Sequence, residues 1–481
     1  MGSLVRPWIF WLEHQTRMQF LLKMPLGRRR VLNVATRVFL CLAILFSSVG
    51  GSVPFSPAHA QGRDISFIRD TEVENTIRFY LQRIFEAAGV DASTIQIHLI
   101  NDSRLNAFVA AGQRIFINTG LLTTAEEPGE VIGVLAHELG HITGGHLSKF
   151  KGTIENAQAA AIAGMLLGLG AALATGDGQA AAAGASLGQQ IGERSFLSYS
   201  RANEQAADQA AMTFLDDAGI SAKGMLSFMR ILQSQDRLYS AGANPYSRTH
   251  PLTEDRIDFV QNHVNTSPVS DAKLPPEYLA VHQRMRAKLE AYLTPKNALR
   301  DYPVSDTSVP AHYARSIAYM ELFRLDESLK EIDALLADSP KDPFFLETKG
   351  DILKRAGKLT EAVENYRATI EILPWAALVR TTLGDTLLQI GGDANVQEAL
   401  DNANIALSYE PDMIRAWNVK GQAHQYRGET GMVLLTQAEV AHRRGEKEQA
   451  KALATRAMEA LPKESASWIQ AQDIIYRADD K

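Results

Sequence analysis

The feature that most restricts the fold is a repeat of about 34 residues in the C-terminal part of the chain. Pro340 and Pro374 are 34 residues apart, and so are Gly350 and Gly384. Apolar and small residues at helical spacing fill each period. A unit of this length forms a helix pair that cannot bury its own apolar face, so neighbouring units must stack into a solenoid.

The repeats are expected to cover residues 311–475. We predict four or so degenerate units, the last of them lengthened by an extra segment around residues 430–445. Such a solenoid offers a concave surface that binds other proteins, and the alternative is a purely structural cap on the preceding domain. Residues 271–310 are expected to connect the two parts, with a charged helix over 275–293 and a proline-containing linker over 294–310.

A second constraint is the sequence His137-Glu138-Leu139-Gly140-His141, inside an apolar stretch over 130–147 that we expect to be a buried helix. Two histidines four positions apart lie one turn from each other on one helix face, so both imidazoles can reach one Zn²⁺. Glu138 is turned by about 100° around the helix. It is poorly placed to bind the ion and well placed to take a proton from a water beside it. The motif therefore predicts a hydrolytic metal site, and two core histidines are the alternative.

A catalytic zinc site needs a third protein ligand and an open position. Glu204 lies on a predicted helix over 198–216, and Asp208 follows one turn later on the same face. We expect Glu204 to be the third ligand and Asp208 to accept the outer N–H of a ligating histidine. His146 is not expected to bind the metal. The longer pattern H-E-x-x-H-x-x-G-x-x-H requires histidine where this chain has Leu147, and a continued helix would turn His146 to the opposite face.

Four sequence motifs, taken in order, resemble the M48 family of zinc metallopeptidases. They are NAFVAAGQRIFINTGLL (106–122), HELGH (137–141), NEQAAD (203–208) and THPLTEDRI (249–257). The resemblance covers residues 66 to about 265, inside an expected domain over 61–270. It implies an α+β gluzincin-type domain that is mostly helical with a small sheet, followed by an all-α tetratricopeptide-like solenoid.

The resemblance also implies roles for individual residues. His137, His141 and Glu204 would bind one Zn²⁺ per chain, with Glu138 as the general base. The strand near Phe108 or Ile115 would line the cleft and pair with an extended peptide, a mode of binding that uses main-chain hydrogen bonds and therefore suits any unfolded chain.

His250 lies between Thr249 and Pro251, after a polar segment over 233–247 that we expect to be a mobile loop. Thr253 then has the position of an N-cap for a helix that carries Arg256, which we place in support of the site. The resemblance puts this motif beside the cleft and leaves two roles open for His250. It either occupies the open zinc position and restrains the enzyme, or it stabilises the oxyanion during catalysis.

The N-terminal residues 1–60 carry seven Lys or Arg and one acidic residue, whereas the whole chain has a net charge of −6. A basic run, an apolar stretch and an A-x-A pattern at 58–60 predict a cleaved export signal. An uncleaved membrane anchor is the alternative, and Met18 or Met24 can be the first residue. Cys41 is the only cysteine and lies in this signal, so a mature chain has no disulfide and no Cys-ligated metal.

Ala, Gly and Leu make up most of residues 157–192. The longest apolar run, 159–174, is shorter than the ~20 residues that span a bilayer, so we expect a helical hairpin. Three roles are open for this hairpin: it covers the cleft, it contacts a membrane surface, or it packs in a core. Residues 184–188 match G-x-S-x-G, but no strand precedes them as a serine hydrolase requires.

Composition excludes several classes of protein. With 46% apolar residues, 7% aromatic residues and a slightly negative charge, the chain does not resemble a nucleic-acid binder or a disordered tail.

An M48-like domain, repeats and an export signal together resemble the periplasmic proteases that act in outer-membrane β-barrel assembly. That resemblance implies unfolded or misassembled outer-membrane proteins as clients and contact of the repeats with the assembly machinery. A non-proteolytic chaperone or scaffold with a vestigial zinc site, and a membrane-anchored protease, are the alternatives.

Overall fold

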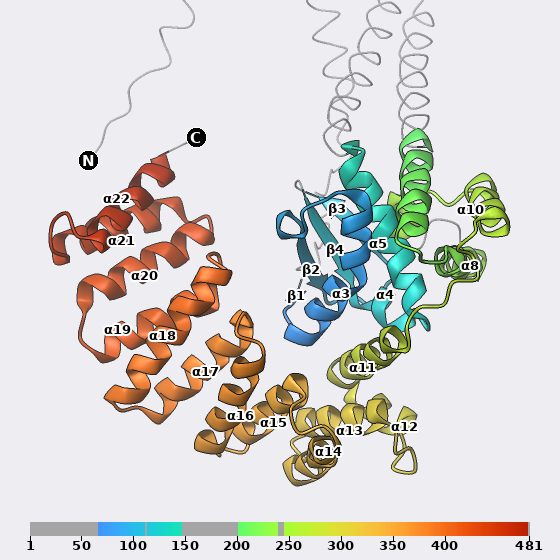
Figure 1. Cartoon of the computed structure of the whole chain (residues 1–481). Coiled ribbons are helices and arrows are strands. Elements are labelled where there is room, and N and C mark those ends of the chain that lie inside the picture. The colour runs from blue at the N-terminus through green and yellow to red at the C-terminus, as the bar shows by residue number, and fades with distance from the viewer. Residues whose placement is uncertain (1–65, 111–112, 147–200, 239–244, 480–481) are drawn as a thin grey trace, which may run out of the picture. The chain divides into compact units, whose positions relative to one another are not determined.

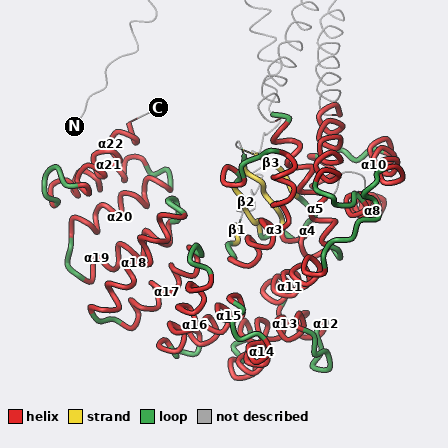
Figure 2. The backbone as a smooth tube through the Cα atoms, viewed as in Figure 1, coloured by secondary structure: helices red, strands yellow, loops and turns green. Residues whose placement is uncertain are grey.

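The computed structural model describes residues 66–110, 113–146, 201–238 and 245–479. All of them belong to one compact unit, Ser66–Lys481. The expected export signal (1–60) and the Ala- and Gly-rich segment (157–192) lie outside the described residues. Figure 1 shows a small sheet surrounded by helices and then a long succession of helices, and Figure 2 shows how strongly helices predominate. Among the described helices, none combines the length and the apolar character that crossing a membrane requires.

The first long helix, α3 (Thr71–Ala88), follows the short strand β1 (Phe67–Ile68). The side chain of Asp70 caps the helix by accepting a hydrogen bond from the backbone N–H of Val73, and Gly89 ends it with a left-handed φ of 63°. Apolar side chains on one face of α3 are fully buried.

The sheet has the strand order β1-β2-β4-β3, with β2 (Gln96–Ile100) parallel to β4 (Arg114–Asn118). β3 (Ala107–Ala110) pairs antiparallel with β4. Because β4 is paired on both sides, it has no edge to offer to a peptide, and the substrate role considered for Ile115 is wrong. Among the described strands, β3 lies at the edge and contacts α5 and α9, so Phe108 remains the predicted substrate strand.

The remaining helices of this domain share one apolar core with α3, the sheet and α11. They are α4 (Thr119–Thr124), α5 (Pro128–Thr143), a helix over 201–217, α8 (Lys223–Leu238), α9 (Pro245–Thr249) and α10 (Glu254–Thr266). The loop predicted over 233–247 is wrong at both described ends, because α8 continues to Leu238 and α9 begins at Pro245. Tertiary packing there overrides the polar composition, since Tyr246 is buried in the same core.

The connecting segment is better ordered than the sequence suggested. α11 (Pro276–Leu293) contacts α3, α4 and α5 and also α12 (Pro295–Asp301) and α13. The irregular linker expected over 294–310 therefore contains a helix. Pro295 stands in its first turn, where proline is tolerated because no helical N–H is needed there, and Ala298 is buried in a core that includes residues of α13.

Between residues 309 and 479 the described chain forms five consecutive helix pairs. They are α13 (Val309–Glu321) with α14 (Leu325–Asp338), α15 (Pro343–Arg355) with α16 (Leu359–Ile372), α17 (Ala377–Ile390) with α18 (Asp393–Tyr409), α19 (Ile414–Tyr426) with α20 (Thr430–Arg443), and α21 (Lys447–Ala460) with α22 (Ala466–Asp479).

The periodic glycines mark the close contacts within these pairs. A Cβ at Gly350 would lie 2.6 Å from the ring of Tyr366, so only glycine lets α15 approach α16 so closely. A helical repeat region is thus confirmed, but its number of units is larger than predicted. Residues 430–443 are not an insertion: they form α20, whose Leu435 and Ala438 are buried. The last pair lacks the proline and glycine spacing by which the earlier pairs were found.

Candidate metal centre

The helix that carries the HELGH motif is fixed at its N-terminus and in its middle. Glu127 and Glu130 form a capping box around Pro128, which satisfies backbone N–H groups that the first turn leaves free. Most of α5 is buried, including His137 and Glu138 at 0% exposure. A buried, capped helix holds the motif in one orientation.

Gly140, inside the motif, brings a second helix to the site. A Cβ at this position would lie 2.8 Å from the carbonyl oxygen and 3.0 Å from the Cα of Ala207. Only glycine therefore allows the helix over 201–217 to pack so closely on α5. Ala207 lies between Glu204 and Asp208 in the chain, so this contact places both carboxylates beside the histidines.

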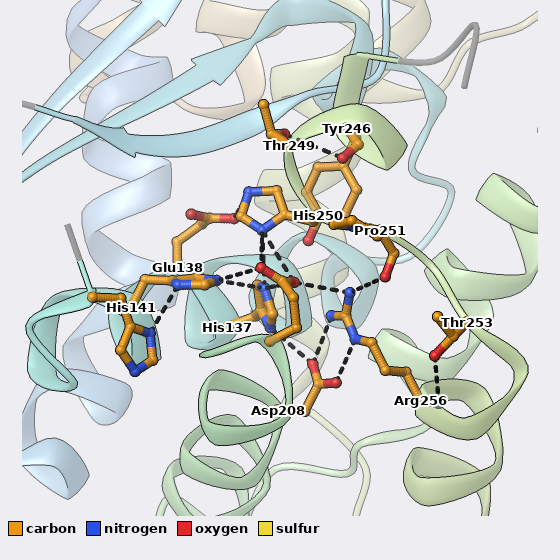
Figure 3. Close-up of polar contacts among 12 residues, drawn as sticks. His137, Glu138, His141, Asp208, Tyr246, Thr249, His250, Pro251, Thr253 and Arg256 are labelled. Atoms are coloured by element: carbon orange, nitrogen blue, oxygen red, sulfur yellow. Dashed lines mark hydrogen bonds and ion pairs between the residues drawn. The ribbon is translucent and has the colours of Figure 1, made fainter. Parts of the chain in front are cut away.

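Four side chains converge on one point, and Figure 3 labels the three histidines among them. The ligand atoms of His137, His141, Glu204 and His250 all lie within 4.8 Å of one another. The Nε2 atoms of His137 and His141 are 3.1 Å apart, and each lies 3.4 Å from a carboxylate oxygen of Glu204. The structure thus brings together all three residues that the sequence predicted as ligands.

Two charged side chains hold this cluster in place. Arg256 on α10 donates from Nε and Nη2 to the two oxygens of Asp208, at 2.6 and 2.9 Å, and its Nη1 lies 2.9 Å from Glu204. Asp208 in turn lies 2.9 Å from Nδ1 of His137. Burial alone would raise the pKa of Asp208, but the hydrogen bonds with Arg256 and His137 outweigh it and lower the pKa. Asp208 is therefore an anion, and it lies where it can accept the outer N–H of His137.

Glu138 differs from the other carboxylates of the cluster. Both of its oxygens are buried and have no hydrogen-bond partner among the described residues, and the nearest cluster atom is Nε2 of His250, 3.4 Å from Oε1. Burial raises the pKa of this carboxyl above its ordinary value, against the opposing effect of His250 and His137. A buried carboxylate with free lone pairs beside a metal cluster can hold a water or accept a proton.

His250 is a buried member of the cluster and not an exposed loop residue, with 6% of its surface exposed. Its backbone N–H donates to the carbonyl of Tyr246, 2.7 Å away, at the end of α9. The ring of Tyr246 stacks on the imidazole with 4.7 Å between the centroids. Nδ1 of His250 lies 3.3 Å from both oxygens of Glu204. The sequence placed His250 near the site but did not reveal the aromatic support from Tyr246.

His146 also lies nearer to the site than predicted. The prediction assumed a helix continuing to residue 147, but α5 ends at Thr143 and Gly145 takes a left-handed φ of 61°. The chain therefore turns back, and Nδ1 of His146 lies 3.0 Å from Nδ1 of His141. His146 thus supports the outer nitrogen of a predicted ligand. Gly144 and Gly145 in sequence are the signal for this turn.

The donor set fits a zinc ion. Imidazole and carboxylate are normal ligands of zinc, and two histidines with one glutamate form a known catalytic combination. Arg256 is the positively charged side chain in direct contact with the two carboxylates Glu204 and Asp208, and Glu138 adds a third carboxyl group. A divalent cation would offset the negative charge buried here, which otherwise destabilises the folded chain.

Comparison with known proteins agrees with this geometry. A sequence model of peptidase family M48 matches residues 71–264. The chain is 25% identical over 380 residues to the β-barrel assembly-enhancing protease of Escherichia coli, covering 77% of this chain and 76% of that protein. It is 27% identical over 278 residues to the putative β-barrel assembly-enhancing protease of Vibrio cholerae, covering 56% of each chain. Residues 71–264 therefore resemble peptidase family M48, and over most of its length the chain resembles the β-barrel assembly-enhancing proteases.

Proposed function

We propose that this protein is a zinc-dependent endopeptidase that acts in the periplasm on outer-membrane β-barrel proteins that fail to assemble. The observation that carries the catalytic part is the convergence of His137, His141 and Glu204, with Glu138 unpaired beside them. One Zn²⁺ per chain would be held by the first three residues. Bound there, it would polarise the scissile carbonyl and lower the pKa of a water at the site.

The residues of the chain supply the remaining steps. Glu138 accepts a proton from the attacking water and passes it to the amine that leaves, since its oxygens are free of other hydrogen bonds. Asp208 and Arg256 do not contact substrate and act as positioning residues for His137 and Glu204. The buried surroundings of the cluster exclude bulk water, which strengthens these interactions.

The edge strand β3 is the proposed binding surface for substrate. It contacts α5, the helix that carries the motif, and pairs with only one neighbour among the described strands. An extended segment added to this edge would run past the cluster. Main-chain pairing does not depend on side-chain sequence, which suits a protease whose clients are unfolded chains.

For His250 the geometry favours the restraining role over the oxyanion role. Its Nδ1 lies among the atoms that would bind the metal, 3.4 Å from Nε2 of His137 and 3.3 Å from Glu204. An imidazole in this position takes the place that water needs. Restraint of this kind protects neighbouring chains until substrate displaces His250.

The biological setting is inferred from the relatives, whose names describe proteases that enhance β-barrel assembly. The periplasmic location relies on the predicted cleaved signal in residues 1–60. We further propose that the helical repeats, which we interpret as tetratricopeptide-like, contact the outer-membrane assembly machinery, and that the segment 157–192 contacts the membrane surface. No nucleic acid is expected as a partner.

Metal analysis of the purified chain together with casein digestion tests the catalytic proposal. We expect close to one zinc per chain, loss of digestion with a chelator and recovery with added zinc. Glu138→Gln should keep the metal. Its rate of casein digestion should fall by about 10³-fold, within the 10²- to 10⁴-fold that a general base contributes. The exposed Glu86→Gln is the matched control and should digest normally. A Glu138→Gln protein that digests casein at a comparable rate would refute the assignment.

The two roles of His250 predict opposite effects of His250→Ala. Removing a restraining side chain should increase casein digestion and self-cleavage, whereas removing an oxyanion donor should reduce turnover by about 10²-fold or more. We expect the increase. Unchanged kinetics would contradict both roles. A protein that never digests casein but still assists assembly of a β-barrel client would instead support the chaperone alternative.

A further inference from the structure

Four ring side chains form a row across the sheet, on the face turned away from the shared apolar core. They are Phe67 on β1, His98 on β2, Phe116 on β4 and Phe108 on β3. The ring of Phe116 stacks on His98 with 4.9 Å between the centroids, and on Phe108 with 5.1 Å. Phe67 lies 6.0 Å from His98 and is 54% exposed. This aromatic row therefore crosses the four described strands and ends at the edge strand β3.

The aromatic row follows from the alternation of side chains along each strand. In β4, Ile115 and Ile117 are fully buried, whereas Phe116 between them is only partly buried. The two ladders pair Phe116 directly with His98 on one side and with Phe108 on the other. Among the described residues, the apolar core behind the sheet does not include the phenylalanines of the row. The rings therefore lie outside the core, on a face that reaches the sheet edge.

The hydrogen-bond pattern of β3 decides how a further strand would meet Phe108. The backbone N–H of Asn118 donates to the carbonyl of Asn106, 2.9 Å away, as in a hydrogen-bonded antiparallel pair. Such pairs recur at every second residue, so Phe108 and Phe116 form the next one. The residues on either side of Phe108 then turn their backbone groups to the open edge. An antiparallel segment added there would face Phe108 in a non-hydrogen-bonded pair, in which side chains approach most closely.

Charges near the aromatic row disfavour some side chains in that position. Burial lowers the pKa of His98 below its ordinary value, and the positive charges of Arg114 and Arg69 lower it further. His98 is thus neutral at pH 7. Arg114 lies two residues before Phe116 on β4 and donates from Nε to Gln96, 2.9 Å away. The row is therefore an uncharged surface beside cationic side chains, and it disfavours a Lys or Arg of a bound segment.

We propose that Phe108, backed by Phe116, selects substrates that place an aromatic or β-branched apolar side chain opposite it in a strand added to β3. Pairs of this kind across neighbouring strands are favourable, so such a residue would extend the aromatic row by one side chain. The inference rests on the proposed peptidase function with β3 as the substrate strand. It adds a preference at one position, which main-chain pairing alone does not provide.

This preference fits the clients proposed above. A transmembrane β-strand carries an apolar residue at every second position. When such a strand is added to β3, one of its two possible registers presents apolar side chains to the aromatic row. A polar loop does so in neither register. Selection at Phe108 would therefore direct cleavage towards the strands of an unassembled barrel.

Mapping of cleavage sites by mass spectrometry tests the proposal with the full, zinc-loaded chain and casein as substrate. Aromatic residues, Val and Ile should be enriched at one fixed distance from the scissile bond. Phe108→Thr keeps a β-branched residue in the strand and should abolish this enrichment, whereas Phe108→Tyr should retain it. The control Phe259→Ala removes a 36% exposed ring from α10 and should also retain it.

Short quenched peptides that differ only at the enriched position measure the size of the effect. Tyr at this position should give a kcat/KM about 2- to 10-fold higher than Ser, the gain of one aromatic pair, and Lys should be poorer than Ser. The difference should lie in KM, because the contact is made equally in the bound substrate and in the transition state. The advantage of Tyr should largely disappear in Phe108→Thr and persist in Phe108→Tyr.

Failure of the inference and failure of the proposed function give different results. Cleavage without enrichment at any fixed distance, or enrichment that Phe108→Thr leaves intact, would overturn the inference and leave the peptidase function standing. Equal loss of the preference in Phe108→Thr, Phe108→Tyr and Phe259→Ala would also overturn it, since any disturbance of the fold would then suffice. No cleavage of casein or of the peptides by the zinc-loaded wild type would refute the peptidase function and the inference with it.

Discussion

The structure contains two buried polar networks that differ in how completely their charges are paired. At the metal centre, Glu138 has no hydrogen-bond partner among the described residues, and Arg256 is shared between Glu204 and Asp208. At the junction of α3, α11 and the first repeats, Glu72 receives hydrogen bonds or ion pairs from Arg284, Lys288 and Tyr313. Glu138 at the metal centre is thus left without a partner among the described residues, whereas Glu72 at the junction is paired by the chain itself.

This difference separates a functional network from a structural one. The unpaired oxygens of Glu138 lie beside the candidate metal ligands, whereas the unpaired oxygen at the junction, Oε2 of Glu347, belongs to a carboxyl whose pKa burial raises. At the junction, Arg284 bridges Glu72 on α3 and Asp342, which caps α15, so one buried guanidinium joins the N-terminal domain to the repeats. The first repeats are thus packed against that domain.

The largest effect is expected from breaking the junction. Lys288 is 2% exposed, and its Nζ lies 2.9 Å from Asp70 and 3.3 Å from Glu72. Lys288→Met leaves buried carboxylates without this partner and should lower the free energy of unfolding in urea by about 3–5 kcal/mol. Lys223→Met removes an exposed ion pair with Asp271 and should cost less than about 1 kcal/mol. Equal losses in the two variants would show that the junction is not a structural clamp.

A smaller effect is expected from removing one positioning residue at the metal centre. Asp208→Asn keeps the shape but loses the negative charge that faces Nδ1 of His137 and pairs with Arg256. Zinc affinity, measured by competition with a chelating dye, should fall by about 10- to 100-fold. Asp216→Asn on the same helix, where Asp216 pairs with His263, should bind zinc normally. If both variants bind zinc equally, Asp208 does not orient the ligand.

A further effect concerns the pH dependence of the junction. Burial raises the pKa of Glu347 to about 8, from an ordinary value of 4.5. Between these two pKa values the folded state keeps the proton that the unfolded chain releases. Protonated Glu347 therefore makes its full contribution to the free energy of unfolding below pH 4.5, and this contribution is lost as the pH rises towards 8. Glu347→Gln cannot titrate, so its urea midpoint should fall less between pH 5 and 8.5 than that of the wild type. The exposed Glu361→Gln should keep the wild-type slope, and identical slopes in all three proteins would contradict this role.

Local signals in the sequence determined many of the elements. Asp70 and Gly89 mark the ends of α3, the spacing of His137 and His141 places both on one helix face, and periodic glycines reveal the helix pairs. These features depend on residues within a few turns of each other, so their physical cause is contained in a short stretch of sequence. The predicted ligands His137, His141 and Glu204 were brought together as expected.

The tertiary structure decided what depends on contacts between distant segments. Ile115 was excluded as a substrate strand because β4 is enclosed by two neighbouring strands. The approach of Ala207 to Gly140, the support of two carboxylates by Arg256 and the pairing at Lys288 join residues far apart in the chain. Sequence patterns report the preferences of a segment, whereas burial and the pairing of buried charges are settled only when segments pack against each other.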